Sequence, residues 1–152
     1  MDVLAVLSLV IAGGALGWSI RTYRASIKLN RRDLFLSLHE QLSRPDRMRG
    51  RSILREEITS VPDAEAIRQS RPGDYELVMS AIIMLDILGL YVKKNYVRKD
   101  LVLEEWGWLY GRCFDHGQHV INERQWYGPD RRTRAPWINF VELGKEASER
   151  YP

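Results

Sequence analysis

The sequence predicts an all-α protein, in which one N-terminal transmembrane helix continues into a cytoplasmic bundle of about four to five helices. Eighteen consecutive uncharged residues, Val3–Ile20, open the chain, and the next twelve carry five basic side chains and no acidic one. Beyond them, apolar residues recur at helical spacing and no segment is convincingly extended. The predicted boundaries are 1–22 for the transmembrane anchor and 23–152 for the cytoplasmic helical domain.

The apolar run is long enough to span a membrane. At about 1.5 Å rise per residue it forms a helix of about 27 Å, close to the roughly 30 Å of hydrocarbon in a bilayer. A cleavable signal peptide carries its positive charge before the apolar core, whereas here only Met1 and Asp2 precede it. The positive-inside rule therefore places the N-terminus outside and the rest in the cytoplasm, at the inner (plasma) membrane. A cleaved signal, or a helix buried in a soluble core or partner, is the alternative.

Basic and aromatic side chains gather at the cytoplasmic end of this run. Aromatic rings suit the membrane interface, and anionic headgroups attract each nearby basic residue by about 1 kcal/mol. We therefore expect membrane lipid with anionic headgroups to be a partner. The predicted membrane-interface residues are Trp18, Arg21, Tyr23, Arg24, Lys28, Arg31 and Arg32.

Gly13 and Gly17 form a small-xxx-small pair within the predicted span. Such a pair lets two helix backbones approach closely, so it predicts a helix-dimer face and a homo-oligomer. The alternative is that glycine is simply common in membrane helices.

The composition of the chain limits which kinds of domain can follow the predicted anchor. The chain has 152 residues, which leaves a single domain large enough to bury a core without disulfides or structural metal. Its one cysteine, Cys113, excludes an internal disulfide and agrees with a reducing cytoplasm. The net charge is only +3, but residues 21–55 hold ten basic residues against three acidic ones. Lipid contact explains this excess before nucleic acid needs to be invoked.

The first helix is expected to run from the anchor to about Ser43, because Pro45 disfavours helical geometry in the residue before it. A second helix is predicted over about 46–59 and near the surface, with Met48, Leu54 and Ile58 as its apolar side and Gly50 as a soft point. Residues 60–73 contain two prolines and are predicted to be a loop with one short helical turn at about 63–67.

Asp74 is the predicted N-cap of a third helix. This helix is apolar all round over 77–92, as the centre of a core must be, and Asn95 supplies a left-handed stop. A fourth helix is predicted over about 100–126, packed on more than one side. Its Gly107 and Gly111 each cost up to about 1 kcal/mol, which a close helix crossing would justify; a break at Gly107 is the alternative.

A final helix is predicted to begin at Pro136, since proline suits the first helical turn. Its expected inward residues are Trp137, Phe140, Val141 and Gly144.

One stretch carries a family resemblance. Residues 85–94 (LDILGLYVKK), followed by Val97, 100–102 (DLV) and 106–107 (WG), resemble a bacterial family of single-pass membrane proteins known only as a domain of unknown function. The resemblance covers roughly residues 1–126 and implies the same topology, an anchor followed by a cytoplasmic helical domain. It implies no catalytic residues. The chain departs from the family in Asn95-Tyr96 and in its Trp-rich C-terminal third.

Asp86 is the one charge within the apolar run 78–92. A buried carboxylate must be paired, hydrogen-bonded or protonated, so we expect a structural partner, either Arg112 or His116. Exposure at a helix edge and a catalytic role are the alternatives.

Cys113, His116 and His119 have zinc-ligand chemistry, but their spacing argues against a metal site. Cys113 and His119 lie about 9 Å apart along a helix, so one ion cannot take all three. His119 with Glu123, at i and i+4, would need ligands from another helix. We therefore expect no metal and no cofactor.

Arginine and aromatic residues in the C-terminal third mark a candidate contact surface. This combination suits a protein partner or lipid headgroups, and nucleic acid less well; a solvated loop that binds nothing is the alternative. The candidate partner-contact residues are Trp108, Trp126, Arg131, Arg132, Arg134 and Trp137.

The chain has no phosphate-binding loop, nucleophile elbow, His-Glu-x-x-His or dinucleotide fingerprint. The leading hypothesis is a non-enzymatic interaction or scaffold module held at the membrane, which self-associates or binds a protein partner. The alternative is a membrane-proximal hydrolase or nuclease that uses Asp86, His116 and His119.

Overall fold

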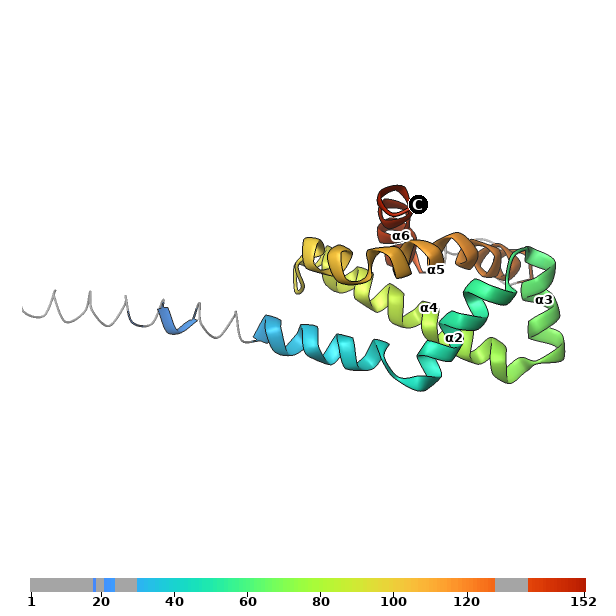
Figure 1. Cartoon of the computed structure of the whole chain (residues 1–152), viewed down its shortest axis with the longest axis horizontal. Helices are drawn as coiled ribbons and strands as arrows, with labels where there is room; N and C mark the ends of the chain where they lie inside the picture. Colours follow the sequence, from blue (N-terminus) through green and yellow to red (C-terminus); the bar gives the residue numbers. More distant parts are fainter. Residues whose placement is uncertain (1–17, 19–20, 24–29, 128–136) are drawn as a thin grey trace, which may run out of the picture. The chain divides into compact units, whose positions relative to one another are not determined.

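The computed structural model describes residues 18, 21–23, 30–127 and 137–152 of the chain (Figure 1). The chain divides into two units, Met1–Leu36 and Ser37–Pro152. In the first unit the described residues are helical, and Thr22 Oγ1 donates to the Trp18 carbonyl at 3.0 Å. The side chains of Trp18 and Tyr23 are exposed.

Much of the predicted anchor lies outside the described residues, so the anchor stays a prediction. Gly13, Gly17, Arg24 and Lys28 are among the residues that are not described. The remaining predicted interface residues are helical and exposed, as contact with water or lipid requires: Trp18, Arg21, Tyr23, Arg31 and Arg32.

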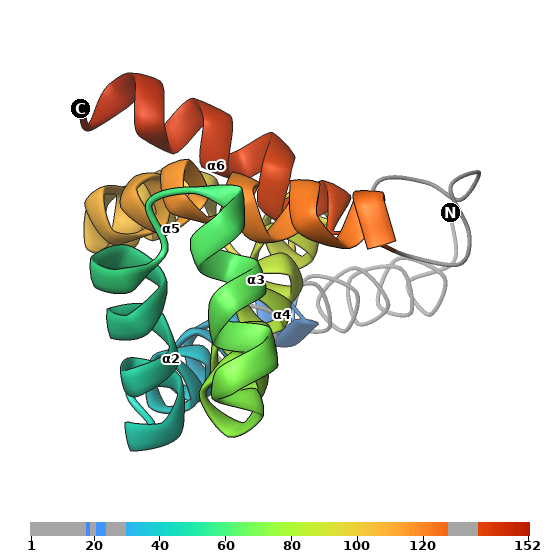
Figure 2. The same cartoon turned by 90° about the vertical axis from the view of Figure 1, so that its right-hand side faces the viewer.

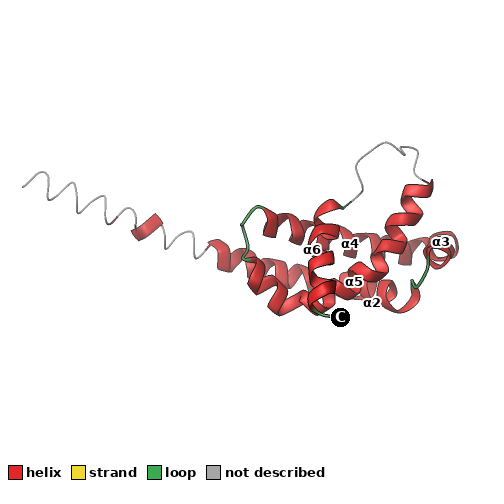
Figure 3. Ribbon diagram, turned by 90° about the horizontal axis from the view of Figure 1, so that it is seen from above, coloured by secondary structure: helices red, strands yellow, loops and turns green. Residues whose placement is uncertain are grey.

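In the described part of the second unit all regular secondary structure is helical, which confirms the all-α prediction there (Figures 2 and 3). Residues 37–42 are helical, and Leu38 and Leu42 on this segment are buried. The helices that follow are α2 (Pro45–Glu57), α3 (Val61–Ser70), α4 (Pro72–Lys93), α5 (Lys99–Tyr127) and α6 (Ile138–Arg150).

Pro45 acts as the sequence predicts. Arg44 before it is extended (φ −61°, ψ 138°), and α2 starts at Pro45 itself. Two details of the prediction for this helix are wrong. Met48 is 54% exposed, and Gly50 is a close crossing point rather than a soft point, because a Cβ there would lie 2.1 Å from the carbonyl oxygen of Leu77 on α4.

The prediction of a loop over 60–73 is also wrong, because α3 forms a helix of ten residues there. Ser60 is extended and caps it: its Oγ accepts from the Asp63 backbone N–H at 3.4 Å and donates to Asp63 Oδ2 at 2.7 Å. These bonds, with those from Thr59, lower the pKa of Asp63. Pro62 lies in the first turn, where the missing N–H costs nothing. Ala64 and Ile67 are buried.

Helix α4 is the centre of the core, as predicted, since it packs against α2, α3, α5 and α6 (Figures 1 and 2). It begins at Pro72, so Asp74 is in its first turn and is not the N-cap. Asp74 instead pairs with Arg49 at 3.0 Å and Arg71 at 3.3 Å. The left-handed stop is confirmed, because Asn95 has φ 57°.

By length and composition, α4 is the one helix among the described residues that is long and apolar enough to cross a membrane. In its most apolar window 44% is buried within the structure. Val78, Ile82, Leu85 and Leu88 are each 0% exposed. Packing against four other helices therefore accounts for much of the apolar character of this helix.

Helix α5 is continuous, so the alternative of a break at Gly107 is wrong and the predicted close crossing is confirmed. A Cβ on Gly107 would lie 2.3 Å from the ring of Tyr151, and one on Gly111 would lie 3.0 Å from the backbone of Ser148. The C-terminal part of α6 therefore lies directly on α5 (Figure 2).

The final helix begins at Ile138, two residues later than predicted. Phe140 and Gly144 are buried as predicted, whereas Trp137 and Val141 are only half-buried. Leu143 and Ala147 complete the buried face of α6.

We expect Gly50→Ala to destabilise the protein by about 1–3 kcal/mol, because the new methyl group would overlap backbone atoms of α4 that cannot move independently. Gly73→Ala is the matched control. A Cβ at Gly73 meets no atom within 4 Å, so helix propensity should stabilise the protein by up to about 1 kcal/mol. Urea unfolding followed by circular dichroism measures both. Equal effects of the two substitutions would contradict the close crossing.

Candidate functional site

Asp86 on α4 caps the N-terminus of α6. Its Oδ1 accepts from the backbone N–H of Asn139 at 3.0 Å and of Phe140 at 2.9 Å, and its Oδ2 accepts from Asn139 Nδ2 at 3.3 Å. The N-cap residue of α6 itself, Trp137, is left-handed (φ 57°, ψ 49°) and makes no side-chain capping bond. The Asp86 carboxylate thus satisfies two free N–H groups and faces the positive end of the helix dipole.

Asp86 has a structural hydrogen-bond partner, as expected, but the partner is the start of α6 and not Arg112 or His116. Within the described residues neither Arg112 nor His116 hydrogen-bonds to Asp86. Arg112 is exposed, and His116 Nδ1 lies 2.9 Å from the carbonyl oxygen of Ile58. A cap supplied by a different helix has no local sequence signature, which is why the pattern around Asp86 could not identify it.

The residues of the alternative catalytic hypothesis do not converge. Asp86 faces α6, His116 contacts the end of α2, and His119 is half-buried one turn further along α5. Among the described residues no group of three His, Cys, Asp or Glu side chains could hold a metal ion. Cys113 is fully buried, and this burial raises the pKa of its thiol to about 12. It is therefore a neutral core side chain.

Glu123 is a buried carboxylate whose role the sequence analysis missed. It is 1% exposed and accepts from Arg68 Nε of α3 at 2.6 Å and from Tyr75 Oη of α4 at 2.8 Å. Burial, followed by the bond to Glu123, raises the pKa of Tyr75. The only sequence signal was that Glu123 lies three residues after Val120, on the inward side of α5. A metal bound by His119 and Glu123 together would need this carboxylate, which already accepts the bonds from Arg68 and Tyr75.

The candidate partner-contact residues do not form one surface within the described part of the chain. Arg131, Arg132 and Arg134 lie outside it, and the side chain of Trp126 is not described. Trp137 is half-buried, with the Arg124 guanidinium 5.5 Å from its ring centroid. Trp108 is 53% exposed on α5, and the Arg55 guanidinium of α2 lies 5.8 Å from its ring centroid.

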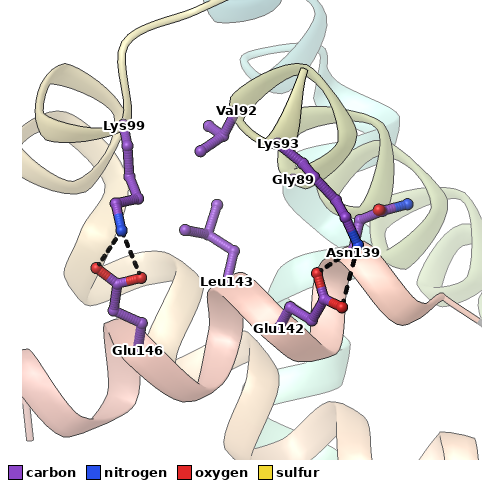
Figure 4. A pocket seen from close by; sticks show the side chains of 8 residues that line it. All are labelled: Gly89, Val92, Lys93, Lys99, Asn139, Glu142, Leu143 and Glu146. Carbon is purple, nitrogen blue, oxygen red and sulfur yellow. Dashed lines mark hydrogen bonds and ion pairs between the residues drawn. The ribbon is translucent and has the colours of Figure 1, made fainter. Parts of the chain in front are cut away.

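A groove of about 170 Å³ opens where the end of α4 and the start of α5 meet α6 (Figure 4). Figure 4 shows Val92 and Leu143 between two ion pairs, each joining α6 to another helix. Lys93 Nζ lies 2.8 Å from Glu142, and Lys99 Nζ lies 2.9 Å from Glu146. All four charged side chains are about half exposed, so these pairs shape the rim more than they stabilise the fold.

The Asp86 cap lies one turn before this groove on α4, and Asn139, which it binds, lines the groove. One turn after Asp86, Gly89 brings α4 against the first turn of α6, since a Cβ there would lie 2.5 Å from the Asn139 carbonyl oxygen. Glu142 and Glu146 then follow at one-turn spacing along α6 and face Lys93 and Lys99. The groove is therefore a product of how α6 docks on α4.

The lining of the groove includes no serine, threonine, cysteine or histidine, and its two lysines are held in ion pairs with glutamates. Its volume is below the roughly 300–1,000 Å³ of pockets that enclose a whole small molecule. An apolar floor between charged rims is instead the arrangement of a protein interface.

Comparison with protein-family models, with curated proteins and with solved structures finds nothing that matches this chain. The resemblance to a membrane-protein family of unknown function therefore stays a prediction.

We expect Asp86→Ala to lower the free energy of unfolding by about 2 kcal/mol, because two N–H groups of α6 lose their acceptor and the helix dipole loses its counter-charge. Asp86→Asn keeps an acceptor but no charge, so it should lose less. Urea unfolding measures all variants. Asp115→Ala, which removes an exposed bond from Ser148 between α5 and α6, is the control. An Asp86→Ala variant no less stable than the control would contradict the capping role.

Proposed function

We propose that this protein is a membrane-anchored helical interaction module that binds a protein partner or a second copy of itself, and that it has no catalytic site. The observation that carries this proposal is the groove in Figure 4, whose apolar floor and charged rims fit a partner side chain and not a substrate. The charged rim can exchange its internal ion pairs for pairs with a partner at little cost, since exposed pairs contribute about 0–1 kcal/mol.

The position at the membrane is supported by the sequence. An uncharged run of 18 residues precedes five basic residues within the next twelve, which is typical of a single span with its N-terminus outside and its following domain in the cytoplasm. The exposure of Trp18, Tyr23, Arg31 and Arg32 is compatible with contact to anionic headgroups of the inner membrane. This placement would limit the partner to proteins that reach the cytoplasmic face.

No observation favours the hydrolase or nuclease hypothesis. Asp86 holds α6, His116 contacts a backbone carbonyl, and among the described residues His119 belongs to no group of three side chains that could hold a metal ion. We therefore do not propose it as a second function.

The anchor is tested by extraction of the full-length protein from membranes at alkaline pH in carbonate. We expect it to stay in the membrane pellet and its C-terminal part to be digested by protease only after the cells are opened. Deletion of residues 1–22 is the matched variant and should release the protein into the soluble fraction. Release of the full-length protein, or digestion of its C-terminal part in intact cells, would contradict the topology.

The groove is tested by charge reversal at its rim. We expect Lys93→Glu with Lys99→Glu to reduce recovery of a cross-linked partner from membranes at least about tenfold, because both rims become acidic. Lys94→Glu with Lys145→Glu makes the same charge change on exposed lysines outside the groove and should leave recovery unchanged. Equal recovery in both variants, with both folded by circular dichroism, would contradict the proposed site.

A further inference from the structure

A stripe of arginines runs along one face of α2. Arg47, Arg51 and Arg55 follow one another at steps of four residues, so they share that face. Arg44, at the N-cap position before the helix, is paired with Asp46 at 3.4 Å. Within the described residues, no carboxylate lies within ion-pair distance of Arg47, Arg51 or Arg55. Three guanidinium groups on successive turns thus repel one another without an internal counter-ion.

The Arg51 side chain, and the Nε of the half-buried Arg47, are also withdrawn from water. Arg51 is 8% exposed, and its Nη1 is buried without a hydrogen-bond acceptor among the described residues. Nε of Arg47 is buried and lacks an acceptor in the same way. Burial lowers the pKa of Arg51. A buried, unpaired cation is costly to retain, so a function that uses the charge would explain its presence.

Helix α5 faces the stripe but does not neutralise it. The ionisable groups that act on Arg51 are Cys113 of α5 and the neighbouring Arg55. The Cys113 thiol has its pKa raised to about 12, so it is neutral near pH 7. Arg55 donates from Nε to the Arg51 carbonyl at 3.2 Å and lies over the ring of Trp108. Its guanidinium is thereby held in place beside Arg51.

We propose that Arg47 and Arg51 bind a phosphoryl group, with Arg55 and the exposed indole of Trp108 at the edge of the site. Residues four apart on a helix have Cβ atoms about 5–6 Å apart, so two guanidinium forks on successive turns can reach one tetrahedral anion. A phosphate monoester carries a charge of about −1.5 to −2 and neutralises both, whereas one carboxylate neutralises only one. The chemistry therefore favours a phosphoryl ligand over an acidic side chain.

The phosphoryl group comes either from an anionic lipid headgroup or from a free phosphate. The excess of basic residues over 21–55 brings either source to α2. This inference does not rest on the groove or on the anchor, and the test is made in detergent, so it stands or falls separately from the proposed function.

The experiment measures thermal unfolding of the full-length protein in micelles of a non-ionic detergent. Added sodium phosphate is compared with sodium chloride at equal ionic strength, and added dioleoylphosphatidate with dioleoylphosphatidylcholine. We expect phosphate or phosphatidate to raise the melting temperature, and chloride and phosphatidylcholine to leave it unchanged. A ligand that binds the folded state stabilises that state. A rise with inorganic phosphate that Arg47→Gln and Arg51→Gln abolish assigns a free phosphate, and a rise with phosphatidate alone assigns a headgroup. A rise with phosphate that both variants keep is the general stabilisation by an excluded salt and counts against the site. No rise with either would overturn the proposal.

Two substitutions on the stripe and one beside it complete the test. We expect Arg47→Gln and Arg51→Gln each to raise the dissociation constant for the phosphoryl ligand about tenfold or more, since each removes a charged hydrogen-bond donor. Arg49→Gln makes the same change on α2 at a residue paired with Asp74, and it should bind as the wild type does. In phosphate-free buffer, Arg51→Gln should raise the melting temperature, because it removes a buried unpaired cation.

A purely structural role would have the opposite signature. If Arg51→Gln lowers the melting temperature equally with and without phosphate, the guanidinium serves the fold and the proposal fails. If Arg51→Gln does not fold, Arg47→Gln provides the test, because Arg47 is only half-buried. Phosphate binding as strong as that of the wild type in Arg47→Gln would also contradict the proposal.

Discussion

The carboxylate of Asp86 supplies the cap that α6 lacks. Trp137, at the N-cap position of α6, is left-handed, a conformation that costs an L-residue about 1–2 kcal/mol, and it offers no side-chain acceptor. The backbone N–H groups of Asn139 and Phe140 instead donate to Asp86 at 3.0 and 2.9 Å. This contact fixes where α6 begins on α4 and therefore where every later residue of α6 meets its neighbours.

The groove and the arginine stripe both depend on such close docking of helices. Gly89 allows α4 to contact the start of α6, and Gly111 allows α5 to contact its later turns. The groove between Lys93, Lys99 and α6 is the space that remains once these contacts are made. On the other side of α4, Gly50 brings α2 close in the same way, and the arginine stripe of α2 is carried against α5.

Local chemistry made much of the helix pattern predictable. Pro45 and Asn95 marked boundaries because each restricts one residue of backbone, and Gly111 implied a close crossing because glycine is costly within a helix. The loop prediction for 60–73 is wrong because its two prolines each lie in the first turn of a helix, where proline favours the helix instead of breaking it. The Asp86 cap, the buried Glu123 and the missing counter-ions of α2 depend on distances between helices, which no local pattern encodes.

Amide hydrogen exchange at Asn139 and Phe140 tests the Asp86 cap most directly. The first N–H groups of a helix normally lack an acceptor, and at an uncapped end they exchange readily with water. Because both donate to Asp86, we expect them to exchange as slowly as amides in the middle of α6, and to exchange fast in Asp86→Ala while the amides of α4 stay protected. Fast exchange at both positions in the wild-type protein would contradict the account.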